Sequence, residues 1–214
     1  MKTHAIKILS IVLIFFSSPT AQNQIKITPC LGTFIYNSEN HLHITEDTNY
    51  LLNYGFELGY INQDIFNHTI QFDYSYIYSI AKGALEIVQT SGWDMGITDV
   101  DASLSFHTLD ILLRNKLSDI FSYGVGPSFS FVNRSVLYDT RDFEDRLSSF
   151  NIGITGTIDT IAPLTEDSRG LYFYWGIKLR YLYGLLYDKE GRNLSNYRQH
   201  FLSLSLLAGI NCRL

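Results

Sequence analysis

The segment YLLNYGFELGY, residues 50–60, alternates between large apolar side chains and small or polar ones. Its even-numbered positions all hold Tyr, Leu or Phe, whereas the odd-numbered positions after Leu51 hold only Asn, Gly and Glu. Successive side chains of a β-strand point to opposite faces, so this period of two predicts a strand with one apolar face and one polar face.

The same alternation recurs along the chain, more weakly in the segment nearest the start. Seven further strands are predicted, at residues 25–36, 69–80, 102–114, 121–132, 150–158, 171–183 and 200–214. No long stretch after residue 24 repeats its apolar residues at the helical period of about 3.6. We therefore predict an all-β chain of eight antiparallel strands.

One predicted strand, at residues 102–114, changes the phase of its alternation partway along. Leu104 and Phe106 have even numbers, whereas the apolar residues that follow, from Leu109 onward, have odd numbers. A β-bulge shifts the alternation by one residue, and for this reason we place one near His107 or Thr108.

The residues on the two faces favour a transmembrane barrel over a soluble sandwich. The chain holds 15 Tyr and 14 Phe, many of them on the apolar faces, but only 17% charged residues. The opposite faces are rich in Gly, Ser, Thr and Asn, which suit the narrow interior of an eight-stranded barrel. Aromatic residues at strand ends, such as Tyr50 and Tyr60, are typical of interfacial girdles. The predicted fold is an eight-stranded antiparallel up-and-down transmembrane β-barrel; a soluble lipocalin-like barrel would turn its apolar faces inward.

Charged residues of both signs occur on the faces predicted to point inward. Their convergence predicts a paired network that takes the place of an apolar core inside the barrel. The predicted members are Glu57, Asp73, Asp110, Arg114, Lys178, Arg180 and Arg213.

The predicted connections alternate in length, as in outer-membrane barrels with long external loops and short periplasmic turns. Long connections are predicted at residues 37–49, 83–101, 133–148 and 184–198. Shorter ones are predicted at residues 61–68 and 115–120, and one of intermediate length at residues 159–170. An even number of strands places both termini on one side, so we expect periplasmic termini and extracellular long loops.

The start of the chain has the order of a secretory signal peptide: two lysines, an apolar run and a stretch of small residues. The apolar run is too short to span a membrane as a helix, which needs about 20 residues. We expect cleavage between Ala21 and Gln22. Residues 1–21 are then the signal peptide, and residues 22–214 form the barrel.

Composition argues against several partners and sites. The formal net charge is −5 and no basic patch is visible, so we expect no nucleic-acid partner. The two cysteines, Cys30 and Cys212, have no zinc-binding spacing, and we expect no metal or other cofactor. Their predicted parities point Cys30 inward and Cys212 outward, which argues against a disulfide between them.

Two groups of residues are the strongest candidates for chemistry. His41 and His43, in the first long connection, form the kind of pair that binds transition metals, although such pairs are more often solvated. A lipid A hydrolase would need a nucleophile beside a general base. Parity places His200 on the outward face but Ser203 and Ser205 on the inward face, so the sequence predicts no catalytic pair and no enzymatic activity.

The chain resembles the small eight-stranded outer-membrane β-barrel proteins, and among them the PorT-like and OmpA-like barrels. The resemblance is carried by TLDILLR at 108–114, YGVGPSFSF at 123–131 and TAQ at 20–22. The last strand, with apolar residues alternating back from Leu214, is similar to the sorting signal read by the outer-membrane assembly machinery. The resemblance implies a Gram-negative outer-membrane location and contact with that machinery during insertion.

Three function classes stay open. The first is a structural or interaction barrel that displays its extracellular loops. The second, implied by the PorT-like resemblance, is a narrow pore or an accessory component of a transport or secretion system. The third and least favoured is an enzyme that modifies lipid A. The expected partners are outer-membrane lipid and lipopolysaccharide, the assembly machinery, and a protein partner that the sequence does not identify.

Overall fold

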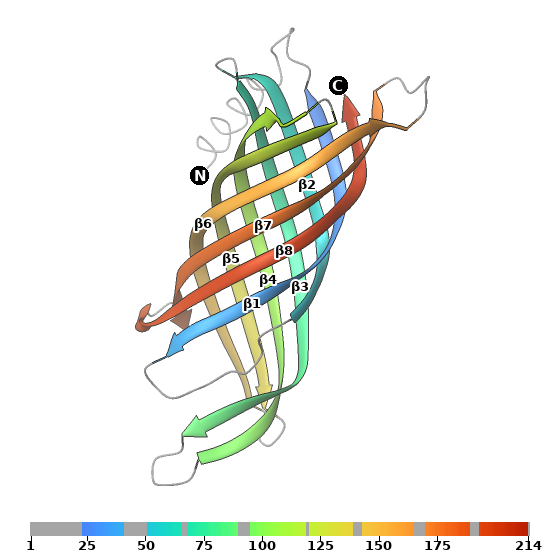
Figure 1. Cartoon of the computed structure of the whole chain (residues 1–214). Helices are drawn as coiled ribbons and strands as arrows, with labels where there is room; N and C mark the ends of the chain where they lie inside the picture. Colours follow the sequence, from blue (N-terminus) through green and yellow to red (C-terminus); the bar gives the residue numbers. More distant parts are fainter. Residues whose placement is uncertain are drawn as a thin grey trace, which may run out of the picture.

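Figure 1 shows the computed structural model, a single closed barrel of steeply tilted strands. The structure describes residues 23–40, 51–65, 68–89, 95–118, 120–138, 143–164, 170–188 and 193–213. The strands are β1 (Gln24–Asn40), β2 (Leu51–Ile65), β3 (His68–Gln89), β4 (Met95–Lys116), β5 (Phe121–Tyr138), β6 (Phe143–Pro163), β7 (Leu171–Asp188) and β8 (Asn193–Arg213). The predicted eight-stranded antiparallel barrel is confirmed.

The pairing of the first strand with the last closes the barrel. β1 and β8 are antiparallel, in a register that runs from Gln24 opposite Arg213 to Asn40 opposite Tyr197. Closure leaves no open sheet edge, so the backbone polar groups of the wall are paired within it. The start of β1 and the end of β8 lie beside the β2–β3, β4–β5 and β6–β7 connections, at what we call the short-turn end. The opposite end is the loop end.

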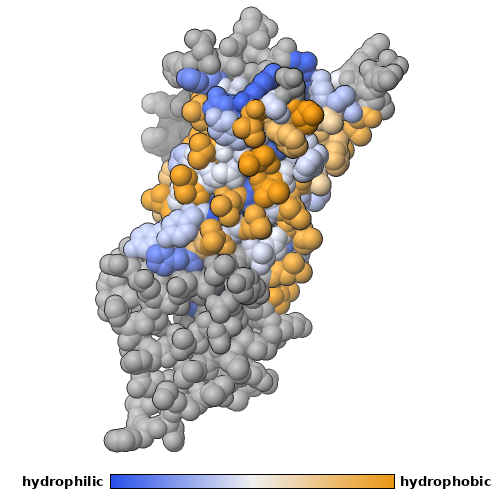
Figure 2. Space-filling model, viewed as in Figure 1, coloured by the Kyte–Doolittle hydropathy of each residue, from blue (hydrophilic) through white to orange (hydrophobic). Residues whose placement is uncertain are grey.

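Side chains alternate across the barrel wall, with apolar residues outward and polar residues inward. The outward residues of β7 from Leu171 to Leu179 are between 42% and 51% exposed. Figure 2 shows residues of this kind as orange side chains over the middle of the wall. On the same strand, Lys178 and Arg180 point into the lumen and are at most 2% exposed. A wall that is apolar outside and polar inside is the arrangement of a transmembrane barrel.

The predicted bulge in β4 is wrong. β4 keeps one register against β5 along its length, and its pairing with β3 is regular at His107 and Thr108. Leu104 and Phe106 have the same inward parity as Thr108 and are buried like it. The apolar pattern changes phase because the lumen itself changes from polar to apolar along its axis.

An apolar layer fills the lumen on the loop-end side of the charged residues. The layer belongs to a buried cluster of Cys30, Ile77, Leu104, Phe106, Val132, Leu182, Phe201, Leu207 and Tyr174. Tyr174 extends this cluster past the charged residues, to Lys26. The Phe106 and Phe201 rings meet edge to face, with centroids 5.1 Å apart. Because their strands, β4 and β8, are not neighbours in the wall, this contact crosses the lumen. The alternation along the sequence does not predict this apolar layer inside the barrel.

Three of the predicted long connections consist mostly of strand. Only residues 90–94 separate β3 from β4, residues 139–142 separate β5 from β6, and residues 189–192 separate β7 from β8. The ribbon of β3 and β4 projects from the lower end of the barrel in Figure 1. The strands were predicted from the alternation of apolar residues, which ends with the apolar band. Backbone pairing needs no apolar face, so the strands continue past that band.

The connections at the short-turn end are short, as predicted for two of them. Residues 66–67 separate β2 from β3, and residues 117–120 separate β4 from β5. The β6–β7 connection ends at Gly170, whose φ of +85° is a left-handed conformation that favours glycine. The Gly170 carbonyl accepts a hydrogen bond of 2.7 Å from the Arg213 backbone N–H, which joins this connection to the end of β8.

Several sequence predictions fall on residues outside the described part of the chain: the signal peptide with its cleavage at Ala21 and Gln22, Tyr50, and the pair His41 and His43. Among the described residues, no helix is long and apolar enough to cross a membrane. Both cysteines are free; Cys30 is buried and Cys212 is partly exposed.

Candidate functional site

Six of the seven predicted interior charges lie together in the lumen. Each is at most 6% exposed: Glu57, Asp73, Asp110, Arg114, Lys178 and Arg180. They come from β2, β3, β4 and β7, because the inward parity of each of these strands carries one or two charged residues to the lumen. The site is therefore built by alternation within strands and by closure between them.

Lys178 is the centre of this group. Its Nζ atom lies 2.5 Å from Glu57 Oε2, 2.7 Å from Asp73 Oδ2 and 3.1 Å from Asp110 Oδ2. A lysine ammonium has three donors, and each of them meets a carboxylate. The side chain is only 1% exposed, so its charge is balanced by these carboxylates in place of water.

A second lysine, Lys26 on β1, shares two of these carboxylates. Its Nζ atom lies 2.7 Å from Glu57 Oε1 and 3.1 Å from Asp73 Oδ1. The same atom lies 4.6 Å from the centroid of the Tyr174 ring, a cation–π contact. Lys26 was not among the predicted interior charges, although it has the same parity as Cys30, which was predicted to point inward.

Arg180 binds the third carboxylate through two nitrogen atoms. Its Nε donates to Asp110 Oδ1 at 3.2 Å, and its Nη2 donates to Asp110 Oδ2 at 2.5 Å. Asp110 Oδ1 also accepts a hydrogen bond of 2.6 Å from the Ser128 hydroxyl. Arg180 Nη2 contacts Ser75 Oγ at 3.2 Å. This bidentate geometry fixes both the charge and the orientation of the Asp110 carboxylate.

Nearer the short-turn end, Arg114 donates to Asp159 Oδ1 and to Gln71 Oε1. Gln71 in turn donates to Asp73 Oδ2 at 2.6 Å, which links this pair to the lysine-centred group. The Tyr174 hydroxyl donates to Asp159 Oδ2 at 3.2 Å. Asp159 was not predicted because the sixth strand was predicted to end at residue 158, one position before it.

The buried charges of the described lumen balance one another. The carboxylates Glu57, Asp73, Asp110 and Asp159 are paired with the cations Lys26, Arg114, Lys178 and Arg180. Burial of an unpaired charge is costly, whereas a fully hydrogen-bonded network of equal and opposite charges is tolerated. We call these eight residues and the polar side chains that join them the lumen network.

The lumen network contains a cluster of acids of the kind that binds metals. Oxygen atoms of Glu57, Asp73 and Asp110 lie within 4.8 Å of one another. The Lys178 ammonium contacts all three carboxylates, so the position of a cation among them is taken by a side chain of this chain. The arrangement fits charge pairing better than metal coordination.

Arg213 does not join the lumen network, and its prediction as a member is wrong. It has the inward parity of Asn211 and Leu207 on β8, but it is the last residue of that strand and its side chain is exposed. Parity predicts direction only where other strands surround the side chain, and at the short-turn end the lumen opens.

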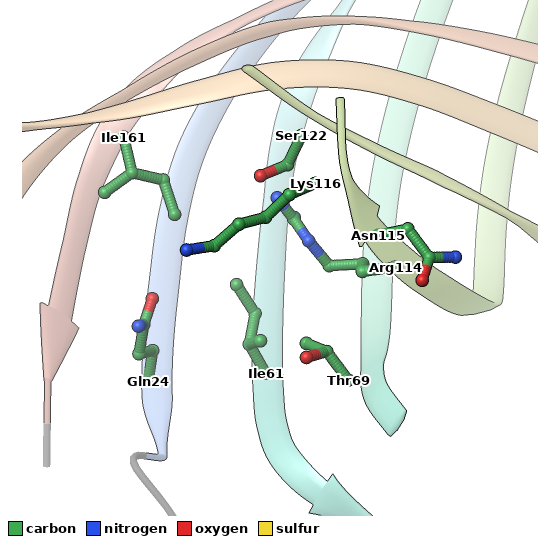
Figure 3. A pocket seen from close by; sticks show the side chains of 8 residues that line it. All are labelled: Gln24, Ile61, Thr69, Arg114, Asn115, Lys116, Ser122 and Ile161. Atoms are coloured by element: carbon green, nitrogen blue, oxygen red, sulfur yellow. The ribbon is translucent and has the colours of Figure 1, made fainter. Parts of the chain in front are cut away.

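A hollow of about 110 Å³ opens at this short-turn end. Two isoleucines, Ile61 and Ile161, form the apolar part of its lining. Six polar or charged residues form the rest: Gln24, Thr69, Arg114, Asn115, Lys116 and Ser122. Figure 3 shows the Lys116 side chain extended across the hollow toward the side of Gln24, while Asn115 points away. We call this hollow the mouth pocket.

The described residues do not bring His200 together with a serine nucleophile. His200 lies on the outer face of the barrel, where its Nδ1 is 2.7 Å from the Tyr181 hydroxyl. Ser205 is buried on the opposite face of the same strand. His107 makes a second outer-face pair of the same kind, with its Nδ1 2.8 Å from the Tyr74 hydroxyl. Both histidines are thus engaged by tyrosines on the outside of the wall.

Comparison with known proteins supports the fold. No family model and no curated protein matches this chain. The solved structure of the outer membrane protein OprG from Pseudomonas aeruginosa is similar over 91% of this chain and 96% of its own, with a TM-score of 0.52 and 10% identity. A major outer membrane protein from Thermus thermophilus aligns at a TM-score of 0.49 and 12% identity, over 90% of this chain and 99% of its own. Neisserial surface protein A aligns at a TM-score of 0.48 and 11% identity, over 91% of this chain and 99% of its own. The likeness to OprG shows that this chain has the fold of an outer-membrane β-barrel.

Proposed function

We propose that this chain is an integral β-barrel of a bacterial outer membrane, with a structural or interaction role carried by the surfaces at its two ends. The outward band of apolar side chains supports a place in lipid, since soluble proteins rarely expose apolar patches of this extent. The role in interaction follows from the lumen, because an interior filled by its own side chains leaves the ends as the available surfaces.

The observation that carries the proposal is the lumen network. Lys26, Lys178 and Glu57 are each at most 1% exposed, so no water column reaches them from either end. The apolar layer on their loop-end side, in which Phe106 packs against Phe201, is a second barrier to hydrated ions. The lumen network and the apolar layer both block the lumen, and together they favour a closed barrel over an open pore.

The proposal includes an orientation and a family. Both termini and the short-turn end face the periplasm, and the loop end faces the outside, as expected for a chain delivered by a signal peptide at residues 1–21. Residues 108–114 and 123–131 favour a PorT-like barrel within the larger group. Lipopolysaccharide surrounds the outer half of the wall, and the outer-membrane assembly machinery inserts the chain. The proposal includes no enzymatic activity.

An accessory role in a transport or secretion system is the second candidate. The PorT-like resemblance of residues 108–114 and 123–131 is the observation in its favour. A closed lumen is compatible with this role if the partner, and not this barrel, contains the conducting path.

Conductance in planar lipid bilayers tests the closed lumen. Purified barrel, shown to be folded by a faster unheated band on a gel, should give no discrete conductance steps. An open porin inserted in the same way is the control for insertion. Discrete steps that are blocked by a thiol reagent acting on Cys30, which lies in the lumen, would overturn the closed barrel and favour a pore.

A further inference from the structure

The mouth pocket borders the lumen network through Arg114, and its chemistry is that of an anion site. We propose that it binds a single phosphate group, carried by a soluble ligand or by a lipid headgroup. This inference goes beyond the proposed function, because a closed structural barrel needs no such site.

The mouth pocket is large enough for one phosphate group. Its volume is about 110 Å³, whereas a space of about 15 Å³ on the same kind of measure admits one water molecule. The pocket is open to solvent on the short-turn side, so a ligand enters without any movement of the wall. A phosphate group fits this space, and a larger ligand would leave its remainder outside the barrel.

The lining of the pocket offers two cations and no carboxylate. Arg114 is 6% exposed and is held in place by Asp159 and Gln71, behind the pocket. Asp159 balances the Arg114 charge, so the positive charge of Lys116, which forms no ion pair with a described residue, is the net charge of the pocket. A phosphate would supply the missing negative charge.

Gln24 lines the same space from the β1 side. Its carbonyl oxygen accepts a hydrogen bond of 2.7 Å from Asn211 Nδ2, on the β8 side. Because that oxygen is engaged by Asn211, the Gln24 NH₂ group is the donor that a ligand in the pocket would use. Figure 3 shows Gln24 on the side toward which the Lys116 ammonium extends. An anion between them would accept bonds from both.

Hydroxyl groups complete the lining. Ser122 on β5 and Thr69 on β3 add one donor each. The donors therefore come from four strands, β1, β3, β4 and β5, and they would surround a bound anion. A phosphate, with oxygen acceptors on all sides, uses such an arrangement better than a halide ion, and charge-assisted bonds to Lys and Arg are the stronger contacts.

Titration calorimetry with inorganic phosphate tests the proposal on the full barrel in an uncharged detergent at low ionic strength. The wild-type barrel should show saturable binding. Lys116→Gln should weaken binding about tenfold, a change of about 1.4 kcal/mol. Gln24→Glu, which places a carboxylate beside the ammonium, should abolish binding. Lys116→Arg, which keeps the charge, should retain binding.

Arg213→Gln is the matched control. Arg213 is an exposed cation at the same end, opposite Gln24 in the β1–β8 register, but it does not line the pocket. It should bind phosphate like the wild type. Equal losses in Lys116→Gln and Arg213→Gln, or no saturable binding by the folded wild type, would overturn the proposal. Each variant is first shown to be folded by its heat-modifiable gel mobility.

Phosphatidylglycerol added to the micelles separates the two sources of phosphate. Competition between this lipid and inorganic phosphate in the wild type, lost in Lys116→Gln, identifies a lipid headgroup as the ligand. Saturable phosphate binding without such competition identifies a soluble phosphate compound. Both results need the same dependence on Lys116, and both support the site.

Discussion

The Lys178 ammonium lies 2.5 Å from Glu57 Oε2, although 121 residues separate the two along the chain. Lys178 belongs to β7 and Glu57 to β2, and these strands are not neighbours in the wall. The contact therefore joins distant parts of the wall across the lumen. In this low-dielectric interior, charge pairing is strong when complete and costly when one partner is lost.

Lys178→Met should destabilise the barrel strongly. The substitution leaves Glu57, Asp73 and Asp110 buried with too few cations, and removal of one partner of a buried pair costs about 3–5 kcal/mol. The free energy of unfolding, measured by urea titration in detergent micelles, checks this. The exposed Lys116→Met should leave it nearly unchanged. Lys178→Met combined with Asp73→Asn should be more stable than Lys178→Met alone; a loss below about 1 kcal/mol in the single variant would contradict the account.

Gly59→Ala should destabilise the barrel through the lumen network. A Cβ atom at Gly59 would lie 2.5 Å from Asp73 Oδ1 and 2.5 Å from Lys26 Cε. Both side chains would have to shift out of their buried ion pair, and overpacking of this kind costs about 1–3 kcal/mol. Gly156→Ala is the control, because its Cβ would meet only the Gly124 carbonyl oxygen, at 3.9 Å. Equal effects of the two variants on urea unfolding would show that the network does not resist displacement.

Ile177→Arg should destabilise the barrel in lipid vesicles. Ile177 is 45% exposed, in the outward band of β7, and an arginine facing the middle of a bilayer costs about 2–4 kcal/mol. Leu117→Arg is the matched control, since Leu117 is 62% exposed in the β4–β5 connection at the short-turn end. Its unfolding free energy should be close to that of the wild type. If Ile177→Arg is equally harmless, the band does not face lipid.

Cys30 should resist thiol reagents until the barrel unfolds. Its side chain is 5% exposed and belongs to the apolar layer of the lumen. In a Cys212→Ser background, mass spectrometry after treatment with N-ethylmaleimide should find no label on the folded protein and full label in denaturant. Rapid labelling of the folded barrel would mean that the lumen is open to solvent at this depth.

The alternation along each strand predicted, for most of the site residues, on which face of the wall the side chain lies. It placed Glu57 and Lys178 in the lumen and predicted opposite faces for His200 and Ser205. It also held the information for Lys26, which shares the parity of Cys30. Asp159 was missed because the alternation of apolar residues in the sixth strand stops at Ile158, whereas its backbone pairing continues to Pro163.

The pairs within the lumen could not be predicted in the same way. Contact between Lys178 and Glu57 depends on the stagger of strands around the closed barrel, which alternation within one strand does not determine. The error at His107 and Thr108 has a related cause. The bulge was predicted because all apolar residues of the strand were expected on one face. A narrow lumen also accepts apolar side chains when they can pack against each other across it, as Phe106 does with Phe201.

The place of this chain in the membrane can be tested by heat-modifiable gel mobility in fractionated membranes. We expect a band in the outer-membrane fraction that resists carbonate extraction. It should migrate faster unheated than boiled, because the closed, internally paired barrel survives detergent. A soluble protein without a mobility shift would contradict the inside–outside assignment of the wall, and with it the proposed place of this chain in the membrane.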